Sequence, residues 1–403
     1  MKKSHIDWCP VIPDHWEEKR IKDIAFLQSG NSITAMDIAE EGKYPVYGGN
    51  GLRGYTNNYT NDGDYVLIGR QGALCGNINY AYGKFYATEH AVVVYTKNEE
   101  ITYWLGETLK AANLNRLSMT AAQPGLAVST LNIQFIPYPP RKERIRIANY
   151  LAEKCTEIDT QVSLLTSKRD AYLRLKKSII NHVVTHGLNP NVKMKDSGIE
   201  WIGEVPEHWE VKRMKDICDY ISRGSTPDYV DEDYQKVMNQ GTFSKGWIDE
   251  SNIRYTKVGK SGAHIKKGDL LMASTGGGVL GKILYFDSID ENYYADSHVT
   301  IMRNSKGINS MKFLFYHFSL RFDEINATMT KGSTNQTELQ RYELLSHKVA
   351  IPPLPEQHAI ATYLDDKCAK IDTILSNLNK QISCYGDLKR SLIDEVITGK
   401  RAV

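Results

Sequence analysis

The chain has 403 residues, of which 41% are hydrophobic and 24% are charged, and its formal net charge is +2. This length exceeds what one ordinary hydrophobic core holds and favours two to four folding units. Because the charges nearly balance, composition excludes a strongly basic protein, and any nucleic-acid interface must depend on local clustering of basic side chains.

No stretch of 18 or more apolar residues occurs, and the first ten residues, MKKSHIDWCP, lack the apolar segment of a signal peptide. The sequence therefore predicts neither a membrane span nor secretion. The six cysteines form no C-x-x-C pair, which argues against a zinc site. We expect free thiols and a cytoplasmic location, where thiols stay reduced.

Two short segments near the start of each half repeat each other. The stretch IPDHWEEKRIKDI, residues 12–24, returns as VPEHWEVKRMKDI, residues 205–217, with nine of thirteen positions identical. Each copy holds a His-Trp pair, at residues 15–16 and 208–209, which we interpret mainly as a structural anchor for the chain as it enters a folded unit. The chain is therefore an internal duplication.

Two longer segments, residues 143–185 and 356–398, also match, with 19 of 43 positions identical. Each reads as one long helix, since apolar residues recur at heptad spacing, a Pro-Pro pair precedes the segment and a glycine follows it. About 43 helical residues span about 65 Å. The order along the chain is globule, helix, globule, helix.

A narrow apolar stripe needs a partner, and the other copy supplies the same stripe, so we predict an antiparallel coiled coil. The alternative, that each helix packs on its own globule, leaves the length of the helices unexplained. The predicted interface residues are Leu151, Ile158, Leu165, Tyr172, Ile179, Leu364, Ile371, Leu378, Tyr385 and Leu392.

The predicted fold class is α+β, with two strand-rich α/β domains separated by two long helices and related by a pseudo-twofold internal repeat. The domains are residues 1–140 and 189–354, and the helical segments are residues 141–188 and 355–403.

Short β-rich runs alternate with turns inside both globules. These runs are residues 65–69, 91–95, 269–273 and 299–303. GDYVLIGRQGALCG (63–76) matches GDLLMASTGGGVLG (268–281), and ATEHAVVV (87–94) matches ADSHVTIM (295–302). Scaffold positions recur while the loops differ, as expected if each copy reads something different.

Several motifs that suggest chemistry have simpler interpretations. The run STGGGVLGKI, residues 274–283, resembles a phosphate-binding loop, but Ile283 stands where that loop needs Ser or Thr, and the next residues favour a strand. His90 and His298 occupy matching positions, and we interpret them as structural, with DNA contact as the alternative. No Ser/His/Asp, H-E-x-x-H or nuclease-like pattern stands out, and the tetrapeptide typical of adenine methyltransferases is absent.

The repeat order resembles that of the specificity subunit of type I restriction-modification enzymes. Further resemblance lies in PVYGGNG (45–51), GSTNQ (332–336) and IPPLPEQHAIATYLD (351–365). The resemblance covers essentially the whole chain.

The resemblance implies a protein without catalytic residues, in which each globule reads one half of a bipartite double-stranded DNA site and the paired helices set the gap. It further implies two methyltransferase subunits and two restriction and translocation subunits as partners. S-adenosylmethionine, ATP and Mg²⁺ would belong to those partners, and this chain would bind no cofactor or metal. Two rival interpretations stay open: a complete nuclease or methyltransferase, and a duplicated coiled-coil adaptor that binds only proteins.

Polar side chains on the variable loops are the candidate base contacts, because Arg and Lys suit guanine while Asn and Gln suit adenine. In the first globule they are Asn50, Arg53, Arg70, Gln71 and Gln123. In the second they are Asn239, Gln240, Thr275, Lys282, Asn335 and Gln336.

Overall fold

The computed structural model describes residues 1–72, 74–97, 101–118, 125–200, 202–231, 234–257, 263–290, 292–332 and 337–403. The chain divides into two compact units. Unit 1 holds Met1–Ser167 together with Asn379–Val403, and unit 2 holds Lys168–Leu378. Each unit therefore contains one globule and a part of both long helices.

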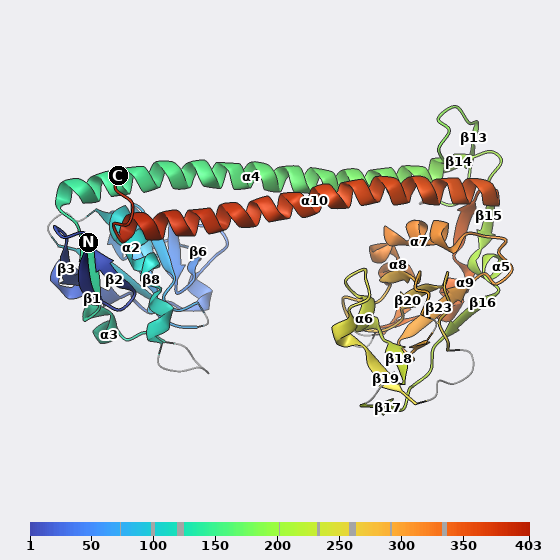
Figure 1. Cartoon of the computed structure of the whole chain (residues 1–403), viewed down its shortest axis with the longest axis horizontal. Helices are drawn as coiled ribbons and strands as arrows, with labels where there is room; N and C mark the ends of the chain where they lie inside the picture. The colour runs from blue at the N-terminus through green and yellow to red at the C-terminus, as the bar shows by residue number, and fades with distance from the viewer. Residues whose placement is uncertain are drawn as a thin grey trace. The chain divides into compact units, whose positions relative to one another are not determined.

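The two predicted long helices are present: α4 spans Arg141–His186, 46 residues, and α10 spans Leu354–Ile397, 44 residues (Figure 1). Both begin directly after a Pro-Pro pair, at a position where the missing proline N–H costs no helical hydrogen bond. Gly187 and Gly399 follow the helices with φ of +75° and +71°. A left-handed residue of this kind ends a helix readily only when it is glycine.

Inside each unit the two helices lie side by side in antiparallel register. Lys389 Nζ of α10 lies 2.7 Å from Asp159 Oδ2 of α4 in unit 1, and Lys176 Nζ of α4 lies 2.6 Å from Asp372 Oδ1 of α10 in unit 2. The two ion pairs use the same repeat positions, 213 residues apart, with the helices exchanged. Exposed pairs of this kind contribute at most about 1 kcal/mol each, so they mark the register more than they stabilise it.

The predicted seam follows the buried side of both helices. Six of its ten residues are buried and four are half-buried. The buried ones are Leu151, Ile158, Leu364, Ile371, Leu378 and Leu392, and the half-buried ones are Leu165, Tyr172, Ile179 and Tyr385.

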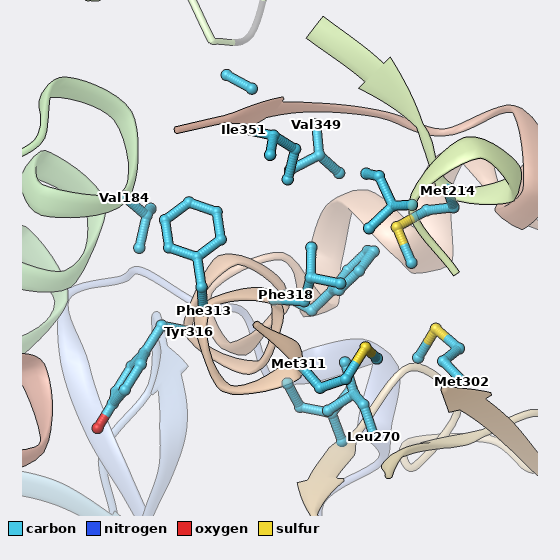
Figure 2. Packing of buried hydrophobic residues seen from close by; sticks show 14 of the residues in the cluster. Val184, Met214, Leu270, Met302, Met311, Phe313, Tyr316, Phe318, Val349 and Ile351 are labelled. Atoms are coloured by element: carbon cyan, nitrogen blue, oxygen red, sulfur yellow. The ribbon is translucent and has the colours of Figure 1, made fainter. Parts of the chain in front are cut away.

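The helices also pack on the globules, which the simple coiled-coil prediction did not include. In unit 1, Leu151 of α4 and Val396 of α10 belong to the same apolar cluster as the globule core. In unit 2, Val184 of α4 joins the core around Phe313, and Figure 2 shows the Phe313 ring pointing towards it. Pairing and packing on a globule are therefore combined, and the two alternatives were not exclusive.

Unit 1 contains two four-stranded sheets with orders β4-β11-β8-β9 and β6-β5-β10-β7. The first is antiparallel throughout, and the second contains one parallel pair, β5 with β10. The strands are β4 (Ala25–Ser29), β5 (Tyr44–Gly48), β6 (Gly51–Thr56), β7 (Asn61–Asp62), β8 (Tyr65–Gly69), β9 (Ile78–Ala81), β10 (Lys84–Ala87) and β11 (Ala91–Thr96).

Unit 2 repeats the first sheet as β16-β23-β20-β21. Its second sheet, β17-β19-β18-β22, repeats three strands and the one parallel pair, β18 with β22, but its fourth strand, β17, adjoins β19, whereas β7 of unit 1 adjoins β10. The strands are β16 (Tyr220–Arg223), β17 (Tyr229–Val230), β18 (Gln235–Met238), β19 (Arg254–Thr256), β20 (Leu270–Ala273), β21 (Ile283–Tyr285), β22 (Tyr293–Ala295) and β23 (Val299–Arg303). The four predicted strand runs correspond to β8, β11, β20 and β23, and the predicted fold class is confirmed.

Smaller elements complete both units. In unit 1 they are β1 (Lys2–Ile6), β2 (Cys9–Ile12), β3 (Glu17–Arg20), α1 (Ile21–Ile24), η1 (Ala35–Asp37), α2 (Thr102–Ala111), η2 (Leu114–Leu117), α3 (Val128–Asn132) and β12 (Phe135–Tyr138). In unit 2 they are β13 (Met194–Asp196), β14 (Glu204–Pro206), β15 (Glu210–Arg213), α5 (Met214–Ile217), α6 (Gln240–Phe243), η3 (Glu250–Asn252), α7 (Met311–Ser319), α8 (Phe322–Thr328), β24 (Thr330–Lys331), β25 (Glu338–Leu339), α9 (Arg341–Ser346) and β26 (Lys348–Ile351). All six cysteines are free thiols, as predicted.

The repeated His-Trp pair ties each globule to the first turn of a long helix. In unit 1, Glu143 Oε2 lies 2.9 Å from His15 Nε2 and accepts a hydrogen bond from Trp16 Nε1 at 3.1 Å. A carboxylate here also suits the positive end of the helix dipole. The motif's structural interpretation is therefore supported in unit 1.

Unit 2 repeats the arrangement with Glu356, which lies 2.7 Å from His208 Nε2 and accepts from Trp209 Nε1 at 3.2 Å. The same tryptophan also touches the end of the other helix. A Cβ added at Gly187 would lie 3.3 Å from Trp209 Cζ2, and one at Gly399 in unit 1 would collide with the Pro13 ring. We call each set the clasp: His15, Trp16, Glu143 and Gly399 in unit 1, and His208, Trp209, Glu356 and Gly187 in unit 2.

We predict that Trp209→Ala lowers the free energy of unfolding by about 3–5 kcal/mol, because the side chain is fully buried against Phe313 and its loss leaves a cavity. Guanidinium unfolding measures the change. Trp247→Ala is the matched control, since that indole is 61% exposed, and its effect stays within about 0.5 kcal/mol. Equal unfolding midpoints for the two variants would contradict the role of the clasp.

Candidate nucleic-acid interface

Four segments of unit 1 meet beside the ends of its two sheets. The Arg70 amide donates to the His90 carbonyl at 2.8 Å, and Arg70 Nη1 donates to Ser29 Oγ at 3.2 Å. A Cβ added at Gly49 would lie 3.2 Å from the carbonyl oxygens of both Gln71 and His90, so glycine permits this approach. We call Ser29, Asn50, Arg70, Gln71 and His90 rim 1.

The predicted base-contact residues of unit 1 differ in the exposure of their side chains and in the contacts that these side chains make. Asn50, in the β5–β6 turn, is exposed and accepts a hydrogen bond from Asn77 Nδ2 at 3.2 Å. Arg53 is exposed on β6, and its Cδ lies so near Gly48 that a Cβ there would be 2.5 Å away. Gln71 is exposed, Arg70 is half-buried, and Gln123 lies outside the described residues.

His90 brings further polar atoms to rim 1. Its Nε2 lies 3.4 Å from Glu89 Oε1. Within the part of the chain that the structure describes, the buried atoms His90 Nδ1 and Glu89 Oε2 have no hydrogen-bond partner. Buried polar atoms are nearly always paired, so these two atoms leave hydrogen-bonding capacity unused at rim 1.

The corresponding segments meet in the same way in unit 2. The Ser274 amide donates to the His298 carbonyl at 2.8 Å, and Thr275 Oγ1 lies 2.6 Å from His298 Nδ1. Arg223, at the end of β16, bonds through Nη1 to Glu338 of β25. We call Arg223, Gln240, Thr275, His298 and Glu338 rim 2.

Backbone hydrogen bonds show that the rims are equivalent. Gly30 donates to Ala91 at 3.0 Å in unit 1, and Gly224 donates to Val299 at 2.9 Å in unit 2. Each of these glycines directly follows the rim residue of its strand, Ser29 or Arg223. The same backbone position therefore presents a hydroxyl in one rim and a guanidinium in the other.

The structure shifts the predicted match between the two glycine-rich stretches by one residue. Gly69 lies opposite Ala91 in its ladder, and Ala273 lies opposite Val299, so Gly69 corresponds to Ala273. The loop after β20 holds one residue more than the loop after β8. Arg70 therefore corresponds to Ser274, whereas the ungapped sequence match paired it with Thr275.

The side chains of two predicted residues of unit 2 already form hydrogen bonds with nearby backbone groups. The Asn239 side chain caps α6 by accepting from the Gly241 amide at 2.8 Å and the Thr242 amide at 3.1 Å. Lys282 Nζ donates to the Ser244 carbonyl at 2.7 Å. Gln240 and Thr275 line the rim, while Asn335 and Gln336 lie outside the described residues.

The glycine-rich run after β20 leads into strand β21 and not into a helix. A phosphate-binding loop needs the amides of a helix N-terminus, so this loop lacks the required geometry. Beside it, the buried Asp296 accepts from the His298 amide at 2.8 Å. Burial raises the pKa of the Asp296 carboxyl above its usual range, although the amide of His298 opposes this. Asp296 positions His298 at the rim.

Sequence reasoning missed Ser29, Arg223 and Glu338. Arg223 and Glu338 are 115 residues apart, and only folding brings them together. One signal was available: the repeat continues to the glycines at positions 30 and 224, and a Cβ at either would collide with a neighbouring strand. The residue before such a glycine lies at the edge of the sheet.

No group of three or more metal-ligating side chains occurs among the described residues, and none of the described helices is long and apolar enough to cross a membrane. The chain matches the family described as "Type I restriction modification DNA specificity domain" at residues 13–163 and 206–383. The two matched ranges begin at or next to the two clasps.

Individual proteins show the same similarity. The chain is 41% identical to the type I restriction enzyme EcoprrI specificity subunit of Escherichia coli over 157 residues, which are 38% of this chain and 39% of that protein. It is 24% identical to the type I restriction enzyme MjaVIII specificity subunit of Methanocaldococcus jannaschii, over 96% of this chain and 93% of that protein. A chain solved in work on complex assembly and conformational transition of the type I R-M system shares the fold, with a TM-score of 0.72, 15% identity and coverage of 97% and 100%.

Asn239 allows a test of which polar residues near rim 2 are structural. We predict that Asn239→Ala lowers the free energy of unfolding by about 1 kcal/mol, because the cap of α6 is lost. Asn239→Asp is the control and retains stability, since aspartate caps equally well. Denaturant unfolding measures both, and an unchanged midpoint for the alanine variant would show that the cap contributes nothing.

Proposed function

The chain belongs to the family of type I restriction-modification DNA specificity subunits, which are non-catalytic, and from this premise we propose that each of its two units reads one half of a bipartite DNA site. The observation that carries the proposal is the pair of equivalent rims with different side chains. A shared backbone that presents Arg70 with Ser29 in one unit and Arg223 with Glu338 in the other suits two readers of unlike sequences.

We propose the same division of the chain as the sequence suggested. Residues 1–140 and 189–354 act as target-recognition domains, and residues 141–188 and 355–403 act as spacer helices. The length of the paired helices sets the unread gap, since readers of B-DNA must match both distance and rotational phase, which recurs about every 10.5 bp.

The partners and cofactors follow from this role. Two methyltransferase subunits dock along the helices and globules, and two restriction and translocation subunits complete the assembly. S-adenosylmethionine, ATP and Mg²⁺ are held by those subunits. The proposed base contacts are Asn50, Arg70 and Gln71 of rim 1, Arg53 of β6, and Gln240 and Thr275 of rim 2.

The direct test is methylome mapping of a host that carries this chain with its methyltransferase subunits. We expect methylation at an interrupted, non-palindromic site, and none when this chain is absent. The chain incubated alone with DNA, S-adenosylmethionine and Mg²⁺ shows no turnover. Methylation without sequence preference would support the protein-only adaptor instead.

Arg70→Ala tests rim 1. We expect the assembled complex to bind its full site about 5- to 150-fold more weakly and to lose selectivity at one position of the first half-site, as is typical of a lost base contact of about 1–3 kcal/mol. Competition gel shifts against single-base variants measure this. Arg20→Ala is the control, because it removes an equal charge that is paired with Asp23. Unchanged affinity and selectivity would exclude Arg70, and an equal loss on every sequence would indicate a phosphate contact.

Changing the length of the two long helices tests the proposal that they act as the spacer. One heptad inserted at matched positions of α4 and α10 adds about 10 Å to the pair, or about 3 bp. We expect methylome mapping to show both half-sites unchanged and the gap lengthened. A seven-residue insertion in the loop at residues 188–192 is the control, because it lengthens the chain but neither helix, and the gap then stays constant. An unchanged gap after the heptad insertion would refute the spacer.

A further inference from the structure

Rim 2 surrounds a hollow of about 730 Å³. The lining residues are Arg223, Gly224, Gln240, Thr275, Gly276, Ser297, His298, Thr337 and Glu338. Arg223 is a basic and Glu338 the acidic member of this lining, and they bond to each other inside it. Their side chains are 34% and 50% exposed, so both can be reached from outside.

Strand backbone fixes both members of the pair. Arg223 lies opposite Thr300 in the β16–β23 ladder. Glu338 belongs to β25, where it lies opposite Lys331, and it also forms an isolated bridge with Thr275. Groups held by strands on both sides are placed before a ligand arrives, which is a requirement for selective recognition.

The pair leaves hydrogen-bonding capacity unused. A guanidinium carries five N–H donors, and Arg223 uses Nη1 for Glu338. Within the described residues, Arg223 Nε is buried and has no hydrogen-bond partner. A buried donor of this kind favours a ligand that arrives later.

We propose that Arg223 and Glu338 together read a G·C base pair in the half-site recognised by unit 2. In the major groove, guanine presents two acceptors, N7 and O6, and cytosine presents one donor, N4–H. Arg223 and Glu338 present the complement, guanidinium donors beside a carboxylate acceptor. An A·T base pair is rejected, because it places the adenine N6 donor opposite the guanidinium donors of Arg223. This inference rests on the proposed function and adds one base pair of its specificity.

Unit 1 lacks this pair. Gln71 bridges to Gly125 as Thr275 bridges to Glu338, so glycine stands where unit 2 has its carboxylate. The match of Arg223 is Ser29, which accepts from Arg70. The reading of G·C by this pair therefore applies to the half-site of unit 2 alone, and unit 1 serves as an internal reference.

The first experiment uses the unmodified complex and its full DNA site, known from the methylome. Each guanine of both half-sites is replaced in turn by 7-deazaguanine, which lacks the N7 acceptor. We expect one guanine in the half-site of unit 2 at which binding falls about tenfold or more, and at which the same replacement has no further effect on the Arg223→Ala complex. If no guanine in that half-site depends on Arg223, the proposal is overturned, whether or not the variant folds well.

The second experiment compares methylomes of Glu338→Gln and Asp290→Asn, two variants that each remove one carboxylate from an ion pair of unit 2. Glu338→Gln is expected to relax the same G·C position by about 10- to 100-fold, while the half-site of unit 1 stays unchanged. Asp290→Asn, whose partner Lys236 lies outside the hollow, leaves both half-sites intact.

The two levels of failure can be told apart. A complex that methylates without any sequence preference refutes the proposed function itself. A complex with a well-defined site, both halves of which survive Glu338→Gln and Arg223→Ala unchanged, keeps the function and refutes the reading of G·C by this pair.

Discussion

The structure depends on one carboxylate in the first turn of each long helix. Glu143 and Glu356 each accept from a tryptophan indole and a neighbouring histidine, and the tryptophan also lies against the glycine that follows the other helix. A long amphipathic helix can slide or rotate along its partner, since its seam is nearly periodic. The clasp removes that freedom, because it joins a globule, the beginning of one helix and the end of the other at a single buried tryptophan.

Duplication explains why the clasp occurs twice and why the rims differ. Ladder registers, the left-handed glycines after the helices and the glutamate contacts recur, and each is required by backbone geometry or burial. Ser29, Arg223 and Glu338 lie at strand ends, where the ladders hold the backbone while the side chains stay outside the apolar core, so these side chains can change without loss of the fold. A scaffold of this kind keeps two binding surfaces rigid while the chemistry of each is free to differ.

The sequence predicted the architecture well because repeats and heptads are local patterns that survive folding. The two long helices and four of the strands followed from residue patterns alone. The rims were predicted less completely. Asn239 carries an amide side chain that could read a base, but this side chain caps α6 by accepting a hydrogen bond from the Gly241 amide. Arg223 and Glu338 were missed because their meeting depends on β16 and β25 lying together across 115 residues. One-residue loop differences, such as that after β20, also displace any ungapped comparison of the copies.

The charge of the chain bears on two properties of DNA binding, the nonspecific attraction to DNA and the selection of a sequence. Nonspecific DNA affinity comes mainly from neutralised phosphates and falls steeply with salt. A chain with a net charge of +2, whose second rim opposes its arginine with a glutamate, has little of that attraction to offer. The balanced charge of this pair favours selective binding. The pair forms hydrogen bonds with a base pair only when its donors and its acceptor both meet complementary groups, and a wrong base pair leaves polar groups of the pair without partners. We therefore expect the salt-dependent part of DNA affinity to come from the other subunits of the complex, with the rims supplying discrimination.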